Sequence, residues 1–244
     1  MPQYLFNYHY FVTHYENDIV KNHDKEKTKQ LKKLVSPFIL RRNKKDVLPE
    51  LPDKIEKTQL ISFDDEEYKI YLANLAQVNS DLQEILNQEK VDNIAILSML
   101  TKLRQLCCEP RLVYENIHTP SSKLMACMEI IENIKESNQK ILLFSSFTSM
   151  LDLIAEQLNL KGISYSMLTG QTSKEKRKDL VDRFQNDSTT VFLISLKAGG
   201  TGLNLTAAQM VIHYDPWWNV SAQNQATDRA YSICQTNKVR KSNW

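Results

Sequence analysis

From Lys140 onward, the chain alternates short apolar runs with amphipathic segments. The apolar runs have the length and composition of buried strands and lie at 140–144, 164–168, 191–195 and 210–214. The amphipathic segments carry apolar stripes at helical spacing, first Phe147, Leu151, Ile154 and Leu158 and then Leu180, Val181 and Phe184. The second of these helices is expected to begin at Thr172, whose spacing to Glu175 is that of a capping box. This alternation predicts a parallel sheet covered by helices on both faces.

The first part of the chain, up to about Glu136, has a helical pattern instead. Acidic residues crowd the segment 62–68, as is typical of a helix N-terminus, and apolar residues then recur close to every 3.6 positions up to Leu86. Further amphipathic helices are expected at about 93–107 and 123–135, and Pro49 and Pro52 mark an extended connector. These boundaries divide the chain into 1–60, 61–137 and 138–244.

A glycine-dense loop follows the third predicted strand. Gly199, Gly200 and Gly202 are three of the five glycines in the chain. Ligands of parallel sheets bind beyond the carboxyl ends of the strands, so we expect this loop to approach a ligand or a nucleic-acid backbone. Its backbone amides, the Thr201 hydroxyl and the Asn204 amide suit phosphate or ribose.

Two common nucleotide-binding loops do not match this segment. The dinucleotide fingerprint lacks its third glycine, because Leu205 stands at that position, and no Gly-Lys-Ser or Gly-Lys-Thr of a Walker loop occurs in the chain. The acidic run 64–67 does not follow an apolar strand, so a helix N-terminus explains it better than a magnesium site. We therefore predict no metal site in this chain.

Overall composition narrows the possible functions less than local sequence patterns do. The net charge is only +2, although ten Lys or Arg stand against two acids between Lys21 and Lys45 and a second basic cluster covers 174–183. Taken alone, each basic run is best explained as a solvated helix face. The four cysteines have no zinc-site spacing, which favours buried or inert thiols. No apolar run is long enough to cross a membrane and no secretion signal is evident, so we expect an intracellular protein.

One further helix face carries candidate chemistry. Gln225, Arg229 and Ser232 lie at i, i+4 and i+7, shortly after the aromatic segment Asp215-Pro-Trp-Trp-Asn219. An arginine on a rigid helix can stabilise the charge of a phosphoryl group in transfer. A lone arginine on an amphipathic helix is, however, more often part of a surface ion pair.

Together these segments resemble the C-terminal motor lobe of the Swi/Snf-type ATPases, the double-stranded-DNA translocases of helicase superfamily two. The resemblance rests on motifs in family order at 141–147, 168–172, 193–208, 215–219 and 225–231. The earlier half is similar to the family as well, at 1–5, 37–42 with Lys44, Asp46 and Val47, 50–52, and 103–107 before Pro110. Several long motifs in register cover nearly the whole chain.

The resemblance implies a RecA-like lobe (138–244), a helical protrusion (61–137) and an interlobe linker (1–60). The partners it implies are double-stranded DNA and an N-terminal ATPase lobe, from the same parent protein or a separate chain. It implies ATP with magnesium as cofactor, shared with that absent lobe and not bound tightly by this chain alone. The expected location is the bacterial cytoplasm, at the nucleoid, or the eukaryotic nucleus.

The residue roles follow by position. The resemblance assigns DNA contacts to Ser145, Ser146, Gly170, Lys197, Ala198, Gly199, Thr201 and Trp217. It assigns nucleotide contacts to Gly200, Gly202, Asn204 and Arg229, catalytic roles to Arg229 and Gln225, and an interlobe brace to Arg41 and Arg42. One of Trp217 and Trp218 is expected in the core and the other near the DNA or the interlobe cleft, with core packing of both as the alternative.

Two departures from the family pattern affect the expected activity. Ser232 stands where the family has a second arginine, and Cys234 stands where it has a glycine. After Val239 the family's final strand and helix give way to Arg-Lys-Ser-Asn-Trp, which predicts an interrupted motor that lacks this strand. Two alternatives remain open: a non-catalytic module that binds DNA or a partner protein, and an RNA helicase lobe.

Overall fold

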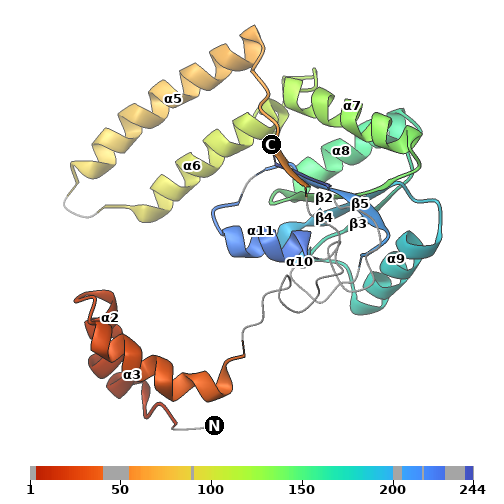
Figure 1. Cartoon of the computed structure of the whole chain (residues 1–244). Coiled ribbons are helices and arrows are strands. Elements are labelled where there is room, and N and C mark those ends of the chain that lie inside the picture. Colours follow the sequence, from red (N-terminus) through yellow and green to blue (C-terminus); the bar gives the residue numbers. More distant parts are fainter. Residues whose placement is uncertain are drawn as a thin grey trace. The chain divides into compact units, whose positions relative to one another are not determined.

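The computed structural model describes residues 4–40, 55–88, 91–199, 205–215, 217–228 and 240–243 (Figure 1). The chain forms two compact units, Met1–Glu50 and Leu51–Trp244. In the described part, no helix is long and apolar enough to cross a membrane.

The N-terminal unit is helical. A first helical segment runs through α1 (Tyr8–Phe11), η1 (Val12–Glu16) and α2 (Asn17–Val20), and α3 (Lys25–Val35) and the short η2 (Ser36–Phe38) follow it. Asp24 caps α3 by accepting hydrogen bonds from the amides of Glu26 and Lys27. The lysines of α3 therefore belong to a regular helix in which no residue is buried.

The second unit contains a six-stranded, entirely parallel sheet. Its strands are β1 (Ile55–Thr58), β2 (Lys140–Ser145), β3 (Tyr165–Leu168), β4 (Val191–Ser195), β5 (Ala208–His213) and β6 (Arg240–Asn243). They lie in the order β1-β6-β5-β2-β4-β3, and every neighbouring pair is parallel. The four predicted strands are confirmed as β2 to β5.

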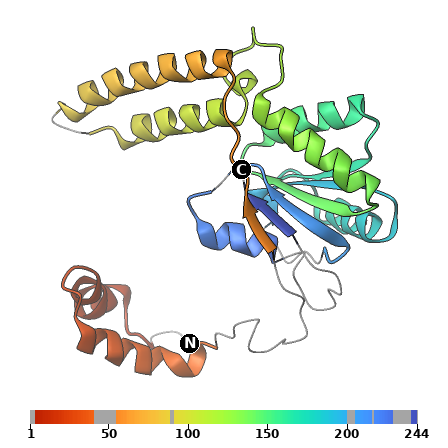
Figure 2. The same ribbon diagram turned by 45° about the horizontal axis from the view of Figure 1, so that its top comes forward.

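Helices cover both faces of this sheet, as predicted (Figures 1 and 2). Alternate residues of each central strand point to opposite faces, so Leu143 packs with α7 (Ser122–Glu136) and α8 (Thr148–Leu160). Leu142 and Phe144 pack on the other face with α9 (Lys174–Asn186), α10 (Leu196–Gly199) and α11 (Val220–Thr227). This RecA-like arrangement leaves the carboxyl ends of the strands at one edge.

Two strands differ from the sequence-based expectation. The sequence predicts a linker over 1–60 and no strand after Val239, whereas β1 and β6 pair with each other and β6 pairs with β5. Their short polar sequences give no apolar run. Lys241 on β6 is only 4% exposed, and its Nζ lies 3.6 Å from Oε2 of Glu56 on β1, so this ion pair allows a charged residue inside the sheet.

The start of α9 also differs from the expectation. Ser173 rather than Thr172 is the N-cap, and its side chain accepts a hydrogen bond from the Lys176 amide. The Thr172 hydroxyl accepts instead from the amide of Thr169, at 3.1 Å. Thr172 therefore shapes the turn that precedes the helix, and the helix begins one residue later.

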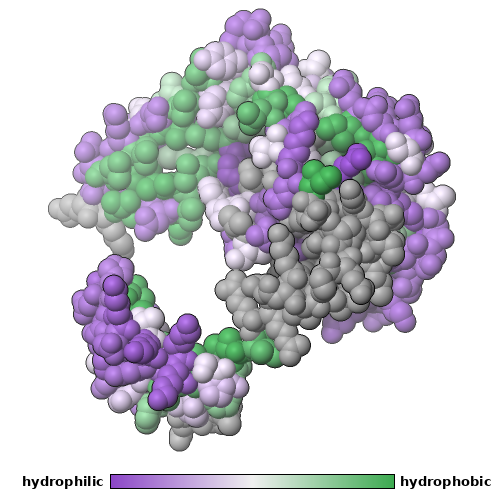
Figure 3. Space-filling model, viewed as in Figure 1, coloured by the Kyte–Doolittle hydropathy of each residue, from purple (hydrophilic) through white to green (hydrophobic). Residues whose placement is uncertain are grey.

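A pair of long helices, α5 (Asp65–Leu86) and α6 (Asn93–Cys108), precedes the sheet region, and the short η3 (Pro110–Leu112) follows α6. Asp64 and Glu67 form a capping box at the start of α5, which confirms the predicted helix N-terminus. The same Glu67 carboxylate also accepts a hydrogen bond from the Ser122 amide at 2.9 Å, so it joins the start of α5 to the start of α7. Apolar side chains such as Ile94 and Leu97 are exposed on this helical pair (Figure 3).

The thiols that the structure describes agree with the prediction for two cysteines. Cys108 and Cys127 are buried, and burial raises the pKa of each to about 12. Cys107 is partly exposed, and burial also raises its pKa. These three cysteines are free, and Cys234 lies outside the described residues.

Candidate nucleic-acid interface

The residues predicted to contact DNA follow strands that are neighbours in the sheet. Ser145 ends β2 and is the register partner of Ser195, which ends β4. Leu168, the last residue of β3, pairs with Ile194 in β4, and Gly170 follows two residues later. Because the strands are parallel, the segments after β2, β3 and β4 emerge at the same edge of the sheet. We call this the carboxyl edge.

Asp215, which follows β5, organises the segment after β2. The Ser145 hydroxyl donates to Oδ1 of Asp215 at 2.5 Å, and the Ser146 amide donates to both carboxylate oxygens at 3.0 and 3.1 Å. The Ser146 hydroxyl also donates to Oδ2. Asp215 is 1% exposed, so its carboxylate is buried and its oxygens accept hydrogen bonds from both serines.

Arg104 approaches the same carboxylate from helix α6. Its Nη2 lies 3.4 Å from Oδ2 of Asp215 and donates to the Ser146 hydroxyl at 3.3 Å. The guanidinium carbon is 5.2 Å from the ring centre of Phe147, 5.4 Å from that of Trp217 and 4.6 Å from that of Trp218. Arg104 therefore joins the helical pair to the aromatic segment after β5.

Helix α11 is held on the sheet by a buried histidine. Nε2 of His213 lies 2.8 Å from the Thr227 hydroxyl, and this hydroxyl also donates to the Gln223 carbonyl at 3.2 Å. The His213 ring stacks on Phe144 with a centroid distance of 5.3 Å. These contacts fix the position of α11, whose backbone includes Gln225.

The turn that contains Gly170 is held by a basic residue of α9. Arg177 Nε donates to the Thr172 carbonyl at 3.0 Å, and its Nη2 donates to the Thr169 carbonyl at 3.5 Å. This arginine therefore braces the turn. An additional Cβ at Gly170 would meet no atom within 4 Å, so the backbone of the turn is open to an approaching group.

The other predicted DNA contacts have different environments. Lys197 on α10 is exposed, whereas the Ala198 side chain is 2% exposed and packs in the core. Ser145 is fully buried, so neither it nor Ala198 presents an accessible surface to a ligand here, and the contact of either with DNA stays a prediction. Trp217 is partly buried against the core and Trp218 is 58% exposed, and the contact of either with DNA stays a prediction.

Several predicted site residues lie outside the described residues. They are Arg41, Arg42, Gly200, Thr201, Gly202, Asn204, Arg229 and Ser232. For Gly199 and Gln225 the structure describes the helical backbone only. Their roles therefore stay predictions.

Sequence reasoning did not assign roles to Arg104 and Asp215. Asp215 follows an apolar strand at the carboxyl edge, where polar residues often take part in binding sites. This position in the sequence could have indicated a functional role for Asp215. Arg104 stands 111 residues earlier, and nothing in its local pattern indicates a partner so distant in sequence.

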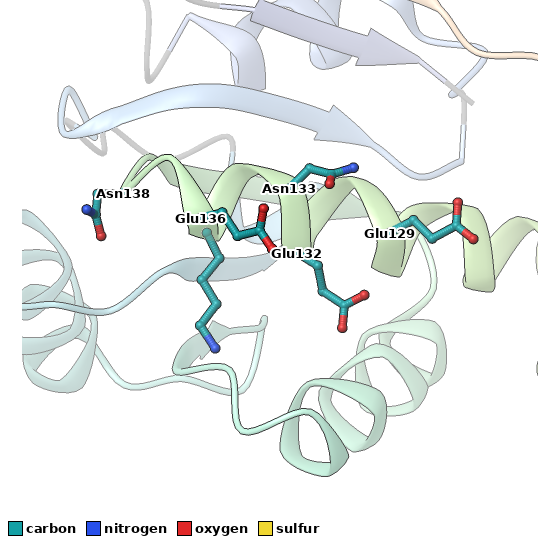
Figure 4. Close-up of a pocket in the computed structure, with 6 residues that line it drawn as sticks. Glu129, Glu132, Asn133, Glu136 and Asn138 are labelled. Carbon is teal, nitrogen blue, oxygen red and sulfur yellow. The ribbon is translucent and has the colours of Figure 1, made fainter.

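A hollow on helix α7 does not belong to this edge. Figure 4 shows its lining of Glu129, Glu132, Asn133, Glu136 and Asn138, with the carboxylates along one helix. Lys161 pairs with Glu132 at 2.7 Å. Lys135 also lines the hollow, but three glutamates against this one lining lysine still disfavour phosphate, so this surface is a poor candidate for a nucleic-acid interface.

Two glycines give opposite expected results at the two edges of the sheet. Gly170→Ala should leave the unfolding free energy nearly unchanged, because the space around Gly170 is open, but it should weaken duplex-DNA binding about tenfold if phosphate approaches this backbone. Gly162 has φ +61°, so Gly162→Ala should cost about 1 kcal/mol of stability and leave DNA binding unchanged. Urea unfolding measures the stability of each variant, and titration with duplex DNA measures its affinity. Equal DNA affinity of the two variants would contradict the close approach at Gly170.

Comparison with known proteins gives two family matches. Residues 1–112 match the SNF2-related domain, and residues 122–234 match the helicase conserved C-terminal domain. An ATP-dependent helicase of Mycoplasma pneumoniae, itself uncharacterized, is 38% identical over 98% of this chain and 23% of its own length. A putative ATP-dependent helicase/translocase of Bacillus subtilis, YwqA, is 37% identical over 92% of this chain and 25% of its own length. The chain thus spans about a quarter of these relatives.

Solved structures show the same relationship. The SWI2/SNF2 ATPase core of Sulfolobus solfataricus in complex with double-stranded DNA is 33% identical, with a TM-score of 0.66, over 99% of this chain and 52% of that chain. The C-terminal domain of the Sulfolobus ATPase is 29% identical, with a TM-score of 0.64, over 78% of this chain and 79% of that chain. With its RecA-like sheet and both family regions in order, this chain belongs to the Swi/Snf-type family of helicase superfamily two.

Proposed function

We propose that this chain acts as the second lobe of an ATP-driven motor that moves along double-stranded DNA. The observation that carries the proposal is the convergence of the segments after β2, β3, β4 and β5 at the carboxyl edge. There the exposed Lys197, the open turn at Gly170 and the Ser146 segment would contact the sugar-phosphate backbone. Contacts of this kind give binding that is weakly sequence-specific and strongly salt-dependent.

ATP with magnesium would be shared with a first lobe. This chain would contribute Gln225 from α11 and Arg229 just beyond it, because the His213–Thr227 contact holds α11 beside the carboxyl edge. Arginine and glutamine suit a transferring phosphate, whereas the sequence contains no Walker loop. A phosphate cradle on one lobe and an arginine on the other complete the site only when the lobes close. We therefore propose that the chain alone does not turn over ATP.

Titration of labelled duplexes tests the DNA half of the proposal. The chain should bind double-stranded DNA of unrelated sequences with similar affinity, and increasing salt should weaken the binding. Double-stranded RNA of matched sequence is the control. A clear preference for RNA would favour an RNA helicase lobe, and the absence of binding to either duplex at low salt would contradict the proposal.

A further inference from the structure

The guanidinium of Arg104 lies among three aromatic rings and one buried carboxylate. Phe147, Trp217 and Trp218 surround it at 4.6–5.4 Å from the guanidinium carbon to the ring centres. Arginine stacks on aromatic faces through its planar guanidinium, which lysine lacks. With its side chain only 20% exposed, Arg104 is better placed to hold these rings than to contact a ligand itself.

Arg104 is not needed to satisfy the Asp215 carboxylate. Both carboxylate oxygens already accept hydrogen bonds from Ser145 or Ser146. The arginine adds a contact between this carboxylate and the indole of Trp218, a ring that is 58% exposed and has few other contacts to fix its place. Its distinctive contribution is therefore the placement of the aromatic segment.

Arg104 is also not needed to attach α6 to the sheet region. The Tyr214 hydroxyl donates to the Cys108 carbonyl at 2.9 Å, which anchors the last residue of α6 beside β5. The buried Glu109 accepts a hydrogen bond from the Ser121 amide at 3.0 Å and so joins the end of α6 to the start of α7. Removal of the Arg104 charge should therefore leave α6 in place.

We propose that Arg104 is a positioning residue that holds Trp217 and Trp218 at the carboxyl edge and thereby presents Trp218 and the Ser146 segment to duplex DNA. This inference rests on the proposed function. It adds a role for the helical pair, because Arg104 of α6 would hold the two indole rings in place at the carboxyl edge. Arg104 acts through the indole and the carboxylate, without contacting DNA.

The test uses the whole chain with Trp244→Phe as background, so that emission comes from Trp217 and Trp218. Arg104→Met removes the charge and the planar group while keeping a long apolar stem, and Arg104→Lys keeps the charge alone. Lys102→Met is the matched control, because Lys102 lies on the same helix but over the Tyr114 ring, 5.8 Å from its centre. Thermal unfolding verifies that each variant is folded.

Acrylamide quenching of tryptophan emission measures the positioning step without DNA. Arg104→Met should increase quenching, Arg104→Lys should give an intermediate value, and Lys102→Met should match the background protein. Duplex titration then measures the consequence: Arg104→Met should weaken binding about tenfold, given the usual strength of cation–π contacts. Combining it with Trp218→Leu should add little to the loss from either change, since both act through the same ring.

The outcomes separate this inference from the proposed function. If the background protein does not bind duplex DNA, the proposed function fails, while quenching still reports whether Arg104 holds the indoles. If the background protein binds DNA and Arg104→Met changes neither quenching nor affinity, the positioning role is wrong. Equal loss of affinity in Lys102→Met would also overturn it, because the effect would then come from net charge.

Discussion

Introducing an arginine at position 232 is expected to raise the ATP turnover of a reconstituted motor about a thousandfold, because a missing arginine finger typically costs that much. Ser232 follows Arg229 by three residues and stands where the family pattern has a second arginine. A serine hydroxyl carries no charge to stabilise the phosphoryl group in transfer. The gain should appear mainly in kcat, since the charge acts in the transition state.

The measurement is DNA-stimulated ATP hydrolysis by this chain mixed with a matching first lobe, with and without Ser232→Arg. Ser188→Arg is the control, because it adds the same charge at an exposed position before β4, at the opposite edge of the sheet. The chain without the first lobe should show no turnover in either variant. If Ser232→Arg leaves turnover at the level of Ser188→Arg, the assignment of a finger position to residue 232 is wrong.

Removal of the Asp215 carboxylate should produce the largest loss of stability among the polar residues of the carboxyl edge. Asp215→Ala leaves the Ser146 amide without its acceptor and Arg104 without its nearby anion. Breaking a buried, hydrogen-bonded charge pair costs about 3 kcal/mol, allowing for the partial exposure of Arg104. Asp215→Asn keeps an acceptor oxygen and should lose less.

Urea unfolding of the whole chain gives these free energies, and near-identical m-values would show that the denatured states are comparable. Asp152→Ala is the control, since Asp152 is exposed on α8 and its loss should change stability by no more than about 0.5 kcal/mol. If Asp215→Ala and Asp152→Ala lowered the free energy of unfolding by the same small amount, the contacts of Asp215 would not stabilise the carboxyl edge.

Much of the fold could be predicted because each central strand has a recognisable apolar pattern over consecutive residues. The strands β2, β4 and β5 contain the apolar runs 141–144, 191–194 and 210–212, as expected when both faces of a strand are buried. The long helix α5 carries its capping box in the local sequence. The outer strands β1 and β6 could not be recognised in this way. Their residues are largely polar and become strands through pairing between segments far apart in the chain.

The candidate site was predictable in position but not in its internal contacts. The position of a loop after a buried parallel strand follows from fold class, which is why Ser146, Gly170 and Lys197 all follow strand ends at the carboxyl edge. The use of the two serine hydroxyls to bind Asp215, and the reach of Arg104 from α6, depend on side-chain packing between distant segments. No spacing rule gives such contacts.

The salt dependence of duplex binding tests the central claim most directly. If the carboxyl edge binds the DNA backbone, Lys197→Gln should reduce the slope of log affinity against log salt by about 1, because one phosphate contact is lost. Lys161→Gln, at an exposed lysine before β3 on the opposite edge, should leave the slope unchanged. The reverse result, a slope altered by Lys161→Gln and untouched by Lys197→Gln, would contradict the account.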